Sequence, residues 1–565
     1  MAELLEFPAN PNSEEGKSPS PPPPPTLKQA HKIRFWGTFV ALCILAFISA
    51  LDVAIITTAF PKITSEIGGA THYVWIANSF VVASSVLQPM FGQLANAFGR
   101  RIPLITSTVL FILGSGIAGG ATNVAMLISG RTIQGAGAGG VYVLLDIVCC
   151  DLVPLRERGK YLGLMFSWSG VAAALGPVAG GALAEANWRW IFYLNIPICG
   201  VALAAILLFM RVKAGGAAQL DVKSRIQQVD HLGNLIFIPS MVSLLIGLVM
   251  GGVQYPWSSW RIILPIVLGS IGWIAFHIQQ LFTSVPSVPA RLFSNRTSAT
   301  AYILTFLSSV IVQAISYFLP VYFQAVKGTT ILRSGVYFLP FAIGTLVSAV
   351  VSGVLLSKFG AYRPLHAAAF FLSAIGFGLF TVLDQHTSDV AWAFFELIAG
   401  AGAGTVMSVL LPAIMAALPE SDVASSSATY SFVRTFGYIW GVTIPGIIFN
   451  AVFNQNLSRI SSQNLQNQLK DGAAYSFASQ AHDIRDKLPE GVWDQAVGVY
   501  TAALRTIWWV GLGISIASFF AVAAERGLEL RKELETEYGI DDQGKKDDGM
   551  QASGEDPTII ESEKP

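Results

Sequence analysis

Charged residues are scarce in this sequence. Asp, Glu, Lys and Arg make up only 12% of its 565 residues, whereas a soluble domain carries about 25%. Basic and acidic residues are equal at 35 each, so no net charge indicates a nucleic acid or another polyionic partner. Because 53% of the residues are hydrophobic and the mean hydropathy is +0.56, the shortage of charge indicates a protein whose solvent is lipid.

Signatures of secreted scaffolds and of enzymes are also missing. The chain has four cysteines, all in or beside apolar segments, so no disulfide framework is indicated. We find no catalytic triad, no zinc motif and no Walker loop, which removes the support for hydrolysis and for ATP-driven transport. We therefore expect neither an enzyme nor a bound metal or cofactor.

Long apolar stretches fill the chain between two polar ends. A membrane-crossing helix needs about 20 apolar residues, and fourteen stretches reach that length. They span 35–59, 74–95, 102–120, 124–148, 161–183, 191–210, 232–252, 261–282, 299–325, 334–357, 364–383, 391–417, 428–453 and 502–524. The sequence therefore predicts an all-α integral membrane protein with 14 transmembrane helices.

The polar ends and the loops between the stretches set the orientation. Residues 1–34 and 527–565 are rich in Pro, Ser, Glu, Asp or Lys, which predicts two disordered tails. With the N-terminus in the cytosol, most loop Lys and Arg fall on the inner side, as the positive-inside rule requires. We therefore expect both tails in the cytosol and a multi-pass protein of the plasma membrane, with the vacuolar membrane as the alternative.

One outer loop is long, covering residues 454–500. It contains the glycosylation sequence that begins at Asn456, so we expect a glycan there. A second such sequence, at Asn295, falls on the cytosolic side and should stay unmodified.

The chain repeats itself at a fixed offset. The segment 92–99 is echoed by 353–360, an offset of 353 − 92 = 261, and 131–139 is echoed by 396–404, an offset of 396 − 131 = 265. Two parallel six-helix halves are expected from such offsets, and their excess length leaves room for one inserted helix pair. The predicted order is an N-terminal half at 35–211, a linker with two extra helices at 212–297, and a C-terminal half at 298–526.

Five short segments carry a family resemblance. They are Leu51–Val53 with Pro61, Gly92–Arg101, Arg131 with Gln134–Gly135, Gly176–Gly181, and Trp188–Pro197. Together they resemble the major facilitator superfamily, and within it the fourteen-helix drug:proton antiporter branch, with fungal multidrug and toxin efflux pumps as the most similar group. The resemblance covers nearly all of residues 35–525. It implies secondary transport in which two halves rock about a midplane site.

Two of these segments correspond to motifs with known roles in that family. The resemblance implies that the helix 5 motif favours export and that the loop motif gates the inner face. The antiporter motif comprises Gly176, Pro177, Gly180 and Gly181, and the gating motif comprises Gly92, Asn96, Gly99, Arg100 and Arg101. Asn96 departs from the family pattern, which has an aspartate at that position. An amide can still form hydrogen bonds, but it brings no charge to the gate.

Five ionisable residues inside predicted spans stand out, because burying a charge there costs about 2.5–3.5 kcal/mol on insertion scales. They are Asp52, Arg131, Asp146, Glu396 and Arg434. We expect Asp52 and Glu396 to carry the coupled proton. Arg131 is expected to assist them, because the repeat places Glu396 at its counterpart position and allows the two to pair across the cavity.

Other readings of the polar residues stay open. Asp146 is expected only to cap a helix or contact a loop, and the role of Arg434 is undecided. The glycine-rich segment 135–140 formally matches a dinucleotide motif, but it lies inside a span, so we expect helix packing instead. Aromatic and amide side chains in the spans are candidates for substrate contact, although each is equally consistent with the core or the interfacial belt. These candidates are Trp75, Asn78, Gln88, Tyr142, Gln313, Tyr317 and Tyr322.

The functional prediction is a secondary active transporter. It would export a small hydrophobic or amphipathic drug, toxin or secondary metabolite by proton antiport, with the substrate, protons and the lipid bilayer as its only partners. Two alternatives remain. One is proton-coupled uptake or vacuolar transport of an amino acid or siderophore-like chelate, and the other is a non-transporting membrane receptor.

Overall fold

The computed structural model describes residues 26–67, 73–211, 221–252, 254–470, 472–485, 487–488 and 491–533. Within these residues all regular secondary structure is helical, apart from one isolated β-bridge between Gly251 and Tyr255. The longer helices are α1 (Thr26–Ile67), α2 (Tyr73–Val86), α3 (Gln88–Phe98), α4 (Arg101–Gly119), α5 (Val124–Leu152), α6 (Leu155–Asn187), α8 (Asn195–Phe209), α10 (His231–Met250), α11 (Trp260–Gln280), α12 (Arg296–Val321), α14 (Leu339–Phe359), α15 (Tyr362–Phe380), α16 (Asp389–Met415), α17 (Val423–Asn456) and α21 (Val492–Ala521). The short ones are α7 (Trp190–Tyr193), α9 (Val222–Ile226), α13 (Ile331–Tyr337), α18 (Gln463–Leu469), α19 (Ala473–Phe477) and α20 (Ala481–Arg485).

The expectation of an all-α membrane protein is confirmed. In the described part of the chain, 12 helical segments are long and apolar enough to cross a membrane. The predicted spans 74–95 and 161–183 are not among them. The first is divided at Leu87 into α2 and α3, because Pro89 in the first turn of α3 lacks the N–H that a continuous helix would use. The second falls on α6.

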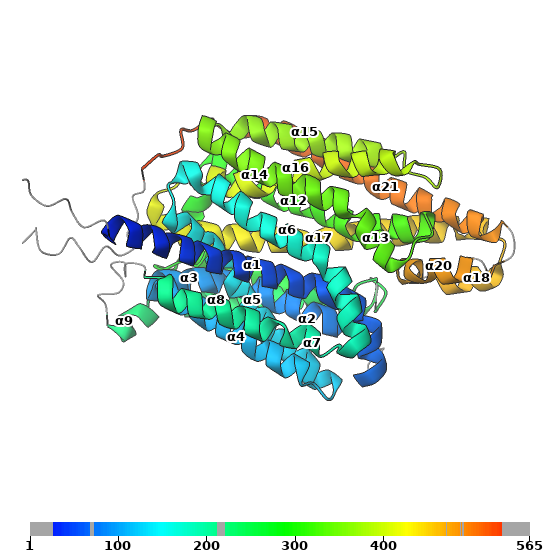
Figure 1. Cartoon of the computed structure of the whole chain (residues 1–565), viewed down its shortest axis with the longest axis horizontal. Coiled ribbons are helices and arrows are strands. Elements are labelled where there is room, and N and C mark those ends of the chain that lie inside the picture. Colours follow the sequence, from blue (N-terminus) through cyan, green and yellow to red (C-terminus); the bar gives the residue numbers. More distant parts are fainter. Residues whose placement is uncertain are drawn as a thin grey trace, which may run out of the picture.

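The internal repeat reappears in the packing. We call α1–α8 the N-terminal half and α12–α21 the C-terminal half. Helix α1 packs on α6 as α12 packs on α17, α4 packs on α5 as α15 packs on α16, and α2 packs on α5 as α14 packs on α16. In Figure 1 the halves lie side by side along the long axis, close together at the end where α1 begins and diverging at the end that carries α18 and α20.

Glycines set the closest helix contacts in both halves. A Cβ atom added at Gly135 of α5 would overlap the Phe80 backbone of α2, and one at Gly400 of α16 would overlap the Phe341 carbonyl of α14. These two glycines are counterparts in the repeat, since 400 − 135 = 265. The prediction that segment 135–140 serves helix packing is therefore confirmed.

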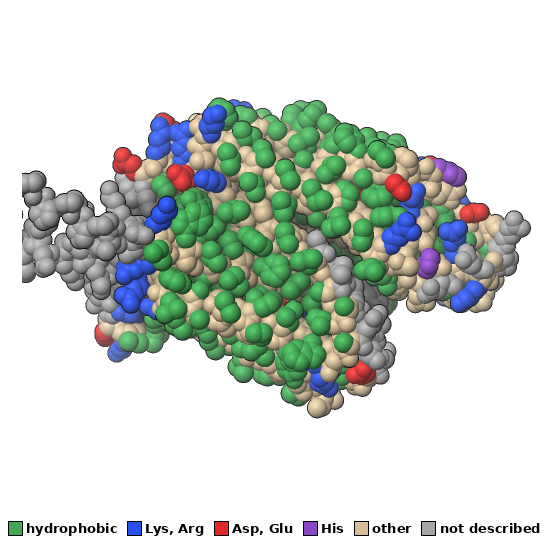
Figure 2. Space-filling model, viewed as in Figure 1, with side chains coloured by type: hydrophobic (Ala, Val, Ile, Leu, Met, Phe, Trp, Pro, Cys, Tyr) green, Lys and Arg blue, Asp and Glu red, His purple; other side chains and the backbone are tan. Residues whose placement is uncertain are grey.

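The ends of the molecule differ from the expected boundaries. Helix α1 begins at Thr26, before the expected span at 35–59. The expected outer loop 454–500 is largely helical, because α18, α19 and α20 bury Leu465, Leu469 and Phe477. At the opposite end the described chain continues past residue 526, and Leu530 is buried against the helices. Lys and Arg gather visibly at that end (Figure 2), which fits a cytosolic face.

Candidate functional site

Asp52 lies at the centre of a buried polar cluster in the N-terminal half. Its side chain on α1 is 0% exposed, and its Oδ2 lies 2.6 Å from Nη1 of Arg131 on α5. Gln134 and Asn195 each donate a side-chain hydrogen bond to Oδ1 at 2.7 Å. The carboxylate is thus held by one cation and two amides. A charge in a low-dielectric interior needs such an ion pair and hydrogen bonds to offset the loss of water.

The cluster draws on four helices. Arg131 and Gln134 stand three residues apart on α5, so they share a face, and Arg131 Nη1 also donates to Gln134 Oε1 at 2.7 Å. Ser115 of α4 accepts from Gln134 Nε2 at 2.8 Å and from Asn195 Nδ2 at 3.2 Å. Sequence reasoning quoted Gln134 and Asn195 only as motif residues. It missed Ser115, because a serine in an apolar span carries no distinguishing signal.

Arg131 is enclosed by rings on its other sides. Its guanidinium carbon lies 4.3 Å from the ring centre of Phe80 and 5.9 Å from that of Phe192. The side chain is 2% exposed, and its Nε atom has no hydrogen-bond partner. Asp52 is therefore the anionic partner that balances this buried cation.

Glu396 lies apart from this cluster. Its Oε2 accepts a hydrogen bond from the backbone N–H of Phe341 at 3.2 Å, and its Oε1 is buried without a partner. Phe341 belongs to the first turn of α14, so the carboxyl group faces the positive end of that helix. The expected pairing of Arg131 with Glu396 is wrong in this conformation, because Arg131 pairs with Asp52 inside its own half.

A second ion pair joins the two halves. Asp146 of α5 is 0% exposed, and its Oδ2 lies 3.5 Å from Arg434 Nη2 and accepts from Ser431 Oγ at 2.8 Å, both on α17. The expectation that Asp146 caps a helix or contacts a loop is wrong. Its position on a long helix gave no hint of the facing helix, since sequence alone did not show that α5 meets α17.

Two further contacts reinforce this inter-half pair. Gln88, at the start of α3, donates to Thr435 Oγ1 of α17 at 3.1 Å. Four residues further on, a Cβ added at Gly92 would overlap the side chain of Ala428. Gln88, a candidate for substrate contact, is thus fully buried between the halves in this conformation. We call Gln88, Asp146, Ser431, Arg434 and Thr435 the inter-half latch.

The other substrate-contact candidates are scattered. The Tyr142 hydroxyl donates to the Ser49 carbonyl at 3.4 Å, and the Tyr322 hydroxyl donates to that of Asp384 at 2.9 Å. Tyr317 is 40% exposed. Gln313 and Asn78 are half-buried, and Gln313 packs on Gly441 of α17, while the Trp75 side chain lies outside the described residues. The structure does not bring the candidates whose side chains it describes together in one pocket.

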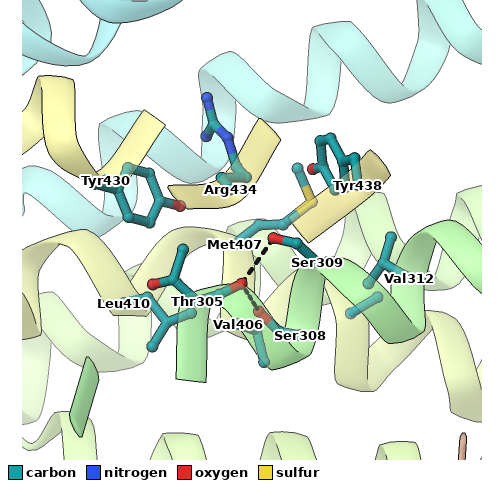
Figure 3. A pocket seen from close by; sticks show the side chains of 11 residues that line it. Thr305, Ser308, Ser309, Val312, Val406, Met407, Leu410, Tyr430, Arg434 and Tyr438 are labelled. Carbon is teal, nitrogen blue, oxygen red and sulfur yellow. Dashed lines mark hydrogen bonds between the residues drawn. The ribbon is translucent and has the colours of Figure 1, made fainter. Parts of the chain in front are cut away.

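A small cavity of about 20 Å³ does lie inside the C-terminal half. It is enclosed by α12, α16 and α17, and none of the sequence candidates for substrate contact lines it. Figure 3 shows hydroxyls of Ser308 and Ser309 bonded to the Thr305 carbonyl on one side, with Tyr430, Arg434 and Tyr438 on the other. The Arg434 guanidinium points away from these serines, which agrees with its pairing to Asp146.

Arg100 of the gating motif pairs with a carboxylate that lies outside the motif. Arg100 Nε donates to Asp151 Oδ2 of α5 at 2.7 Å, and Arg100 Nη1 donates to the Asn96 side chain at 3.3 Å. Asp151 therefore supplies the charge that Asn96 cannot. Arg101 donates to the Leu207 carbonyl at 2.6 Å, and Gly99 has φ +78°, a value that favours glycine at this turn.

The antiporter motif lies on α6, where this helix packs against α1. A Cβ added at Gly176 would overlap Ala54 of α1, and Gly180 is buried. Pro177 and Gly181 also lie on α6, but their surroundings are outside the described residues. The glycines thus allow the close approach of the two helices within the N-terminal half.

The end of the molecule that we expect to face the cytosol is closed by further contacts between the halves. Arg158 at the start of α6 pairs with Glu420, which precedes α17, at 2.7 Å. Arg156 donates to the Ser357 carbonyl at 2.8 Å and to the Lys358 carbonyl at 2.6 Å, at the end of α14. Together with the inter-half latch, these contacts describe a conformation that is closed at the end expected to face the cytosol.

Residues 525–533, which we call the C-terminal strap, cross this closed face (red coil in Figure 1). Glu525 lies 2.9 Å from His366 of α15, and the Arg526 N–H donates to Thr297 Oγ1 of α12 at 3.0 Å. At the other end of the strap, the Arg531 carbonyl accepts a hydrogen bond from the backbone N–H of Arg156 at 3.1 Å. This bond satisfies one of the first N–H groups of α6, which has no side-chain cap. The strap therefore links the two halves.

A glycine substitution tests the tight contact between α3 and α17. In Gly92→Ala the added methyl meets Ala428, so the closed state should lose about 1–3 kcal/mol, the usual range for overpacking, or roughly 5- to 150-fold in population. The readout is thiol labelling, in inside-out vesicles, of a Ser427→Cys reporter, because Ser427 is fully buried on α17 in this state. Gly200→Ala on α8 is the control, since a Cβ there has no neighbour within 4 Å. Equal labelling of both variants would contradict the proposed close contact.

Truncation tests the strap. A chain that ends after Arg526 loses the bond to Arg156 and should label faster at the Ser427→Cys reporter than the full chain, because α6 loses its cap. A chain that ends after Glu533 keeps every strap contact described above and should label at the full-chain rate. If both truncations behave like the full chain, the strap has no part in holding the cytosolic face closed.

Comparisons with known proteins give the same family. The profile of the Major Facilitator Superfamily matches residues 42–442. The MFS efflux transporter aclA of Aspergillus oryzae is 44% identical over 516 residues, covering 90% of this chain and 92% of the relative. The efflux pump FUS6 of Gibberella fujikuroi is 41% identical over 536 residues, covering 94% and 96%. The MFS-type efflux pump LUC4 of a Fusarium species is 40% identical over 526 residues, covering 93% and 92%.

Solved structures show the same fold at low identity. The proton:xylose symporter XylE superposes with a TM-score of 0.51 at 15% identity, over 81% of this chain and 96% of that one. The human organic anion transporter MFSD10 gives a TM-score of 0.50 at 14% identity, over 88% and 100%. With a family profile over most of its length and relatives above 40% identity, this chain belongs to the Major Facilitator Superfamily.

Proposed function

We propose that this protein is a proton-coupled efflux pump for a small hydrophobic or amphipathic compound, such as a toxin or secondary metabolite. The efflux class rests on full-length relatives that are named efflux transporters and pumps. The proton coupling is supported by one observation above the others. A carboxyl group, Asp52, is fully buried within a membrane-spanning helix and holds a buried arginine at 2.6 Å.

In this proposal Asp52 is the proton site. When it is ionised, it holds Arg131, Gln134 and Asn195 together and so fixes α1 against α5 and α8. A proton arriving from outside would remove the charge that balances Arg131. The arginine would then have to find another acceptor, and the packing of α1 within the N-terminal half would change. Glu396 is proposed as a second protonatable group, with Arg131 as the residue that senses Asp52.

The closed cytosolic face supplies the gating step. With the inter-half latch, the Arg158–Glu420 pair and the strap in place, substrate and protons exchange with the outside only. We propose that release of these contacts opens the cytosolic side for substrate loading, through rocking of the two halves. Gly92, Asn96, Gly99, Arg100 and Arg101 would guide this motion, and the glycines of α6 would allow α1 to shift.

We also propose the full membrane topology. Counting α2 with α3 as one span and α6 as another gives fourteen spans. These are two six-helix halves at 35–211 and 298–526, with α10 and α11 as an inserted pair in the linker at 212–297. The tails at 1–34 and 527–565 would lie in the cytosol, with the strap packed against the closed cytosolic face. The plasma membrane is the proposed location, and the vacuolar membrane is the alternative.

The sequon at Asn456 is proposed as a glycan site on the outer side. Asn456 is the last residue of α17, and α18 and α20 lie at the same end of the molecule, opposite α9 (Figure 1). Its side-chain nitrogen donates to the Val452 carbonyl at 2.8 Å in the unmodified chain. Glycosidase treatment should increase the electrophoretic mobility of the wild type and leave that of Asn456→Gln unchanged. An unchanged wild type would contradict the assignment.

The proposed function is tested by the retention of a panel of fluorescent lipophilic compounds in cells that express the chain. Export predicts lower retention in expressing cells, and proton coupling predicts that a protonophore removes the difference. Accumulation stimulated by low external pH would instead support the alternative of uptake of an amino acid or chelate. A difference that survives the protonophore would overturn the proton coupling but not the export.

A further inference from the structure

Helices α10 and α11 lie against both halves at once. Helix α10 packs on α2 of the N-terminal half and on α17 of the C-terminal half. Those two helices border the seam that must open if the halves rock. The pair cannot stay fixed to both, so its attachment decides which half it accompanies.

Toward the N-terminal half the attachment is a buried polar network centred on Gln93 of α3. Gln93 is 7% exposed, and its Oε1 accepts from the Asp230 N–H at 3.1 Å and from Asn234 Nδ2 at 3.0 Å. Its Nε2 donates to Ser287 Oγ. Asp230, which caps α10, also accepts from Gln280 Nε2 of α11 at 2.6 Å. The side chain of Gln93 thus contacts the start of α10 and the loop that follows α11, and Asp230 extends the network to α11.

The internal repeat supplies a comparison within the same chain. The counterpart of Gln93 is Val354 on α14, since 354 − 93 = 261. Val354 is 44% exposed on the outer surface of the helix bundle, where an apolar side chain suits lipid. The polar residue therefore stands only in the copy of the repeat that α10 and α11 cover, which indicates that Gln93 serves their attachment.

Toward the C-terminal half the pair presents rings. The ring centres of Phe237 on α10 and Phe432 on α17 are 5.2 Å apart, and those of Trp273 on α11 and Phe436 are 5.9 Å apart. Apolar contacts are non-directional, so such surfaces can slide at low cost. Breaking the Gln93 network would instead leave several buried polar groups without hydrogen-bond partners, at a free-energy cost of about 1–3 kcal/mol each.

The connection to the C-terminal half continues beyond the network. The Val288 N–H donates to Gln280 Oε1 at 3.0 Å and so belongs to the network side. Three residues later, Arg291 binds Asp422 at the start of α17 at 2.7 Å. Any relative movement must therefore be taken up between Val288 and Arg291.

We propose that α10 and α11 move with the N-terminal half as one body, that Gln93 is the positioning residue that attaches them, and that their ring surface slides over α17. This inference rests on the proposed alternating-access function and on the proposed inserted pair. It assigns the pair a mechanical role as part of the N-terminal rocking body.

Two disulfide cross-links separate the possibilities. Gln93→Cys with Asn234→Cys joins the pair to the N-terminal half, and Phe237→Cys with Phe432→Cys joins it to the C-terminal half. We expect the oxidised 237–432 link to reduce export at least tenfold, with recovery after reduction. The oxidised 93–234 link should keep export near the wild-type rate and should exceed its own reduced form, because the covalent bond replaces the lost network. The four native cysteines are all buried, and each single-cysteine variant serves as an oxidation control.

The opposite pattern, with export lost only in the 93–234 link, would overturn the inference and attach the pair to the C-terminal half. Export blocked by both links, or by neither, would also overturn it. The same variants are examined by labelling of the Ser427→Cys reporter in inside-out vesicles. If the wild type shows no export, the proposed function is contradicted. The reporter still tests this inference in that case, because its labelling shows which cross-link prevents opening of the cytosolic side.

A matched pair of point variants supplies a second measurement. Gln93→Val installs the residue found at the counterpart position and should lower the maximal export rate several-fold, with substrate affinity unchanged. Val354→Gln, the reverse exchange on α14, should leave the rate unchanged. A shift in apparent affinity for Gln93→Val, without a change in rate, would contradict a positioning role.

Discussion

Replacing Asp52 by Asn is expected to abolish proton-coupled export while the protein still reaches the membrane. The substitution keeps the size of the side chain but removes the charge that balances Arg131 at 2.6 Å and the group that would bind the proton. Breaking a buried ion pair at one partner costs about 3–5 kcal/mol. Export in intact cells and the amount of protein at the surface are the two measurements.

A double variant separates the chemical role from the structural one. Asp52→Asn combined with Arg131→Gln removes both charges, so no unpaired cation is left among Phe80 and Phe192. We expect this variant to be more stable to heat than Asp52→Asn alone and equally inactive. If the double variant regains proton-dependent export, Asp52 serves only to neutralise Arg131, and the proton site lies elsewhere.

The second large effect is expected at the inter-half latch. Asp146→Asn should shift the protein away from the cytosol-closed state, because Arg434 is then left buried without its anionic partner. At about 3–5 kcal/mol for a broken buried pair, the shift should exceed a hundredfold in the ratio of closed to open forms. Labelling of the Ser427→Cys reporter in inside-out vesicles should rise accordingly, and export should fall.

Neutralising both partners provides the control for this effect. In Asp146→Asn with Arg434→Gln no buried charge remains, and an amide pair can still bond between α5 and α17. Labelling of this double variant should lie between those of the wild type and Asp146→Asn. Wild-type labelling in the single variant would show that the ion pair does not stabilise the closed state, and the latch would be reduced to a packing contact.

Much of the fold could be predicted because membrane insertion leaves a strong one-dimensional signal. Long apolar runs, loop charge and the repeated glycine segments at 135–140 and 400–404 are all local features of the sequence. The break in the second predicted span was harder to foresee. It depends on Pro89, whose effect on α3 competes with a continuous apolar pattern.

The sites were predicted less completely, because their geometry is set by contacts between distant helices. An ionisable residue inside a span is conspicuous, so Asp52 and Arg131 were identified. Their partners could not be assigned, since the repeat suggested Glu396 for Arg131 whereas the structure pairs it with Asp52. Asp146 acquires its role only through α17, and Asp151 only through Arg100, both of which lie far away in the sequence.

The most direct test of proton-coupled export through Asp52 uses inside-out membrane vesicles, whose lumen corresponds to the outside of the cell. A lipophilic compound that the retention panel identifies is added to vesicles with an acidic lumen. Proton antiport predicts that the compound accumulates in the lumen with the wild type, that collapse of the pH gradient prevents this, and that Asp52→Asn vesicles show none. Accumulation that persists without the gradient, or that is equal in Asp52→Asn vesicles, would contradict proton-coupled export through Asp52.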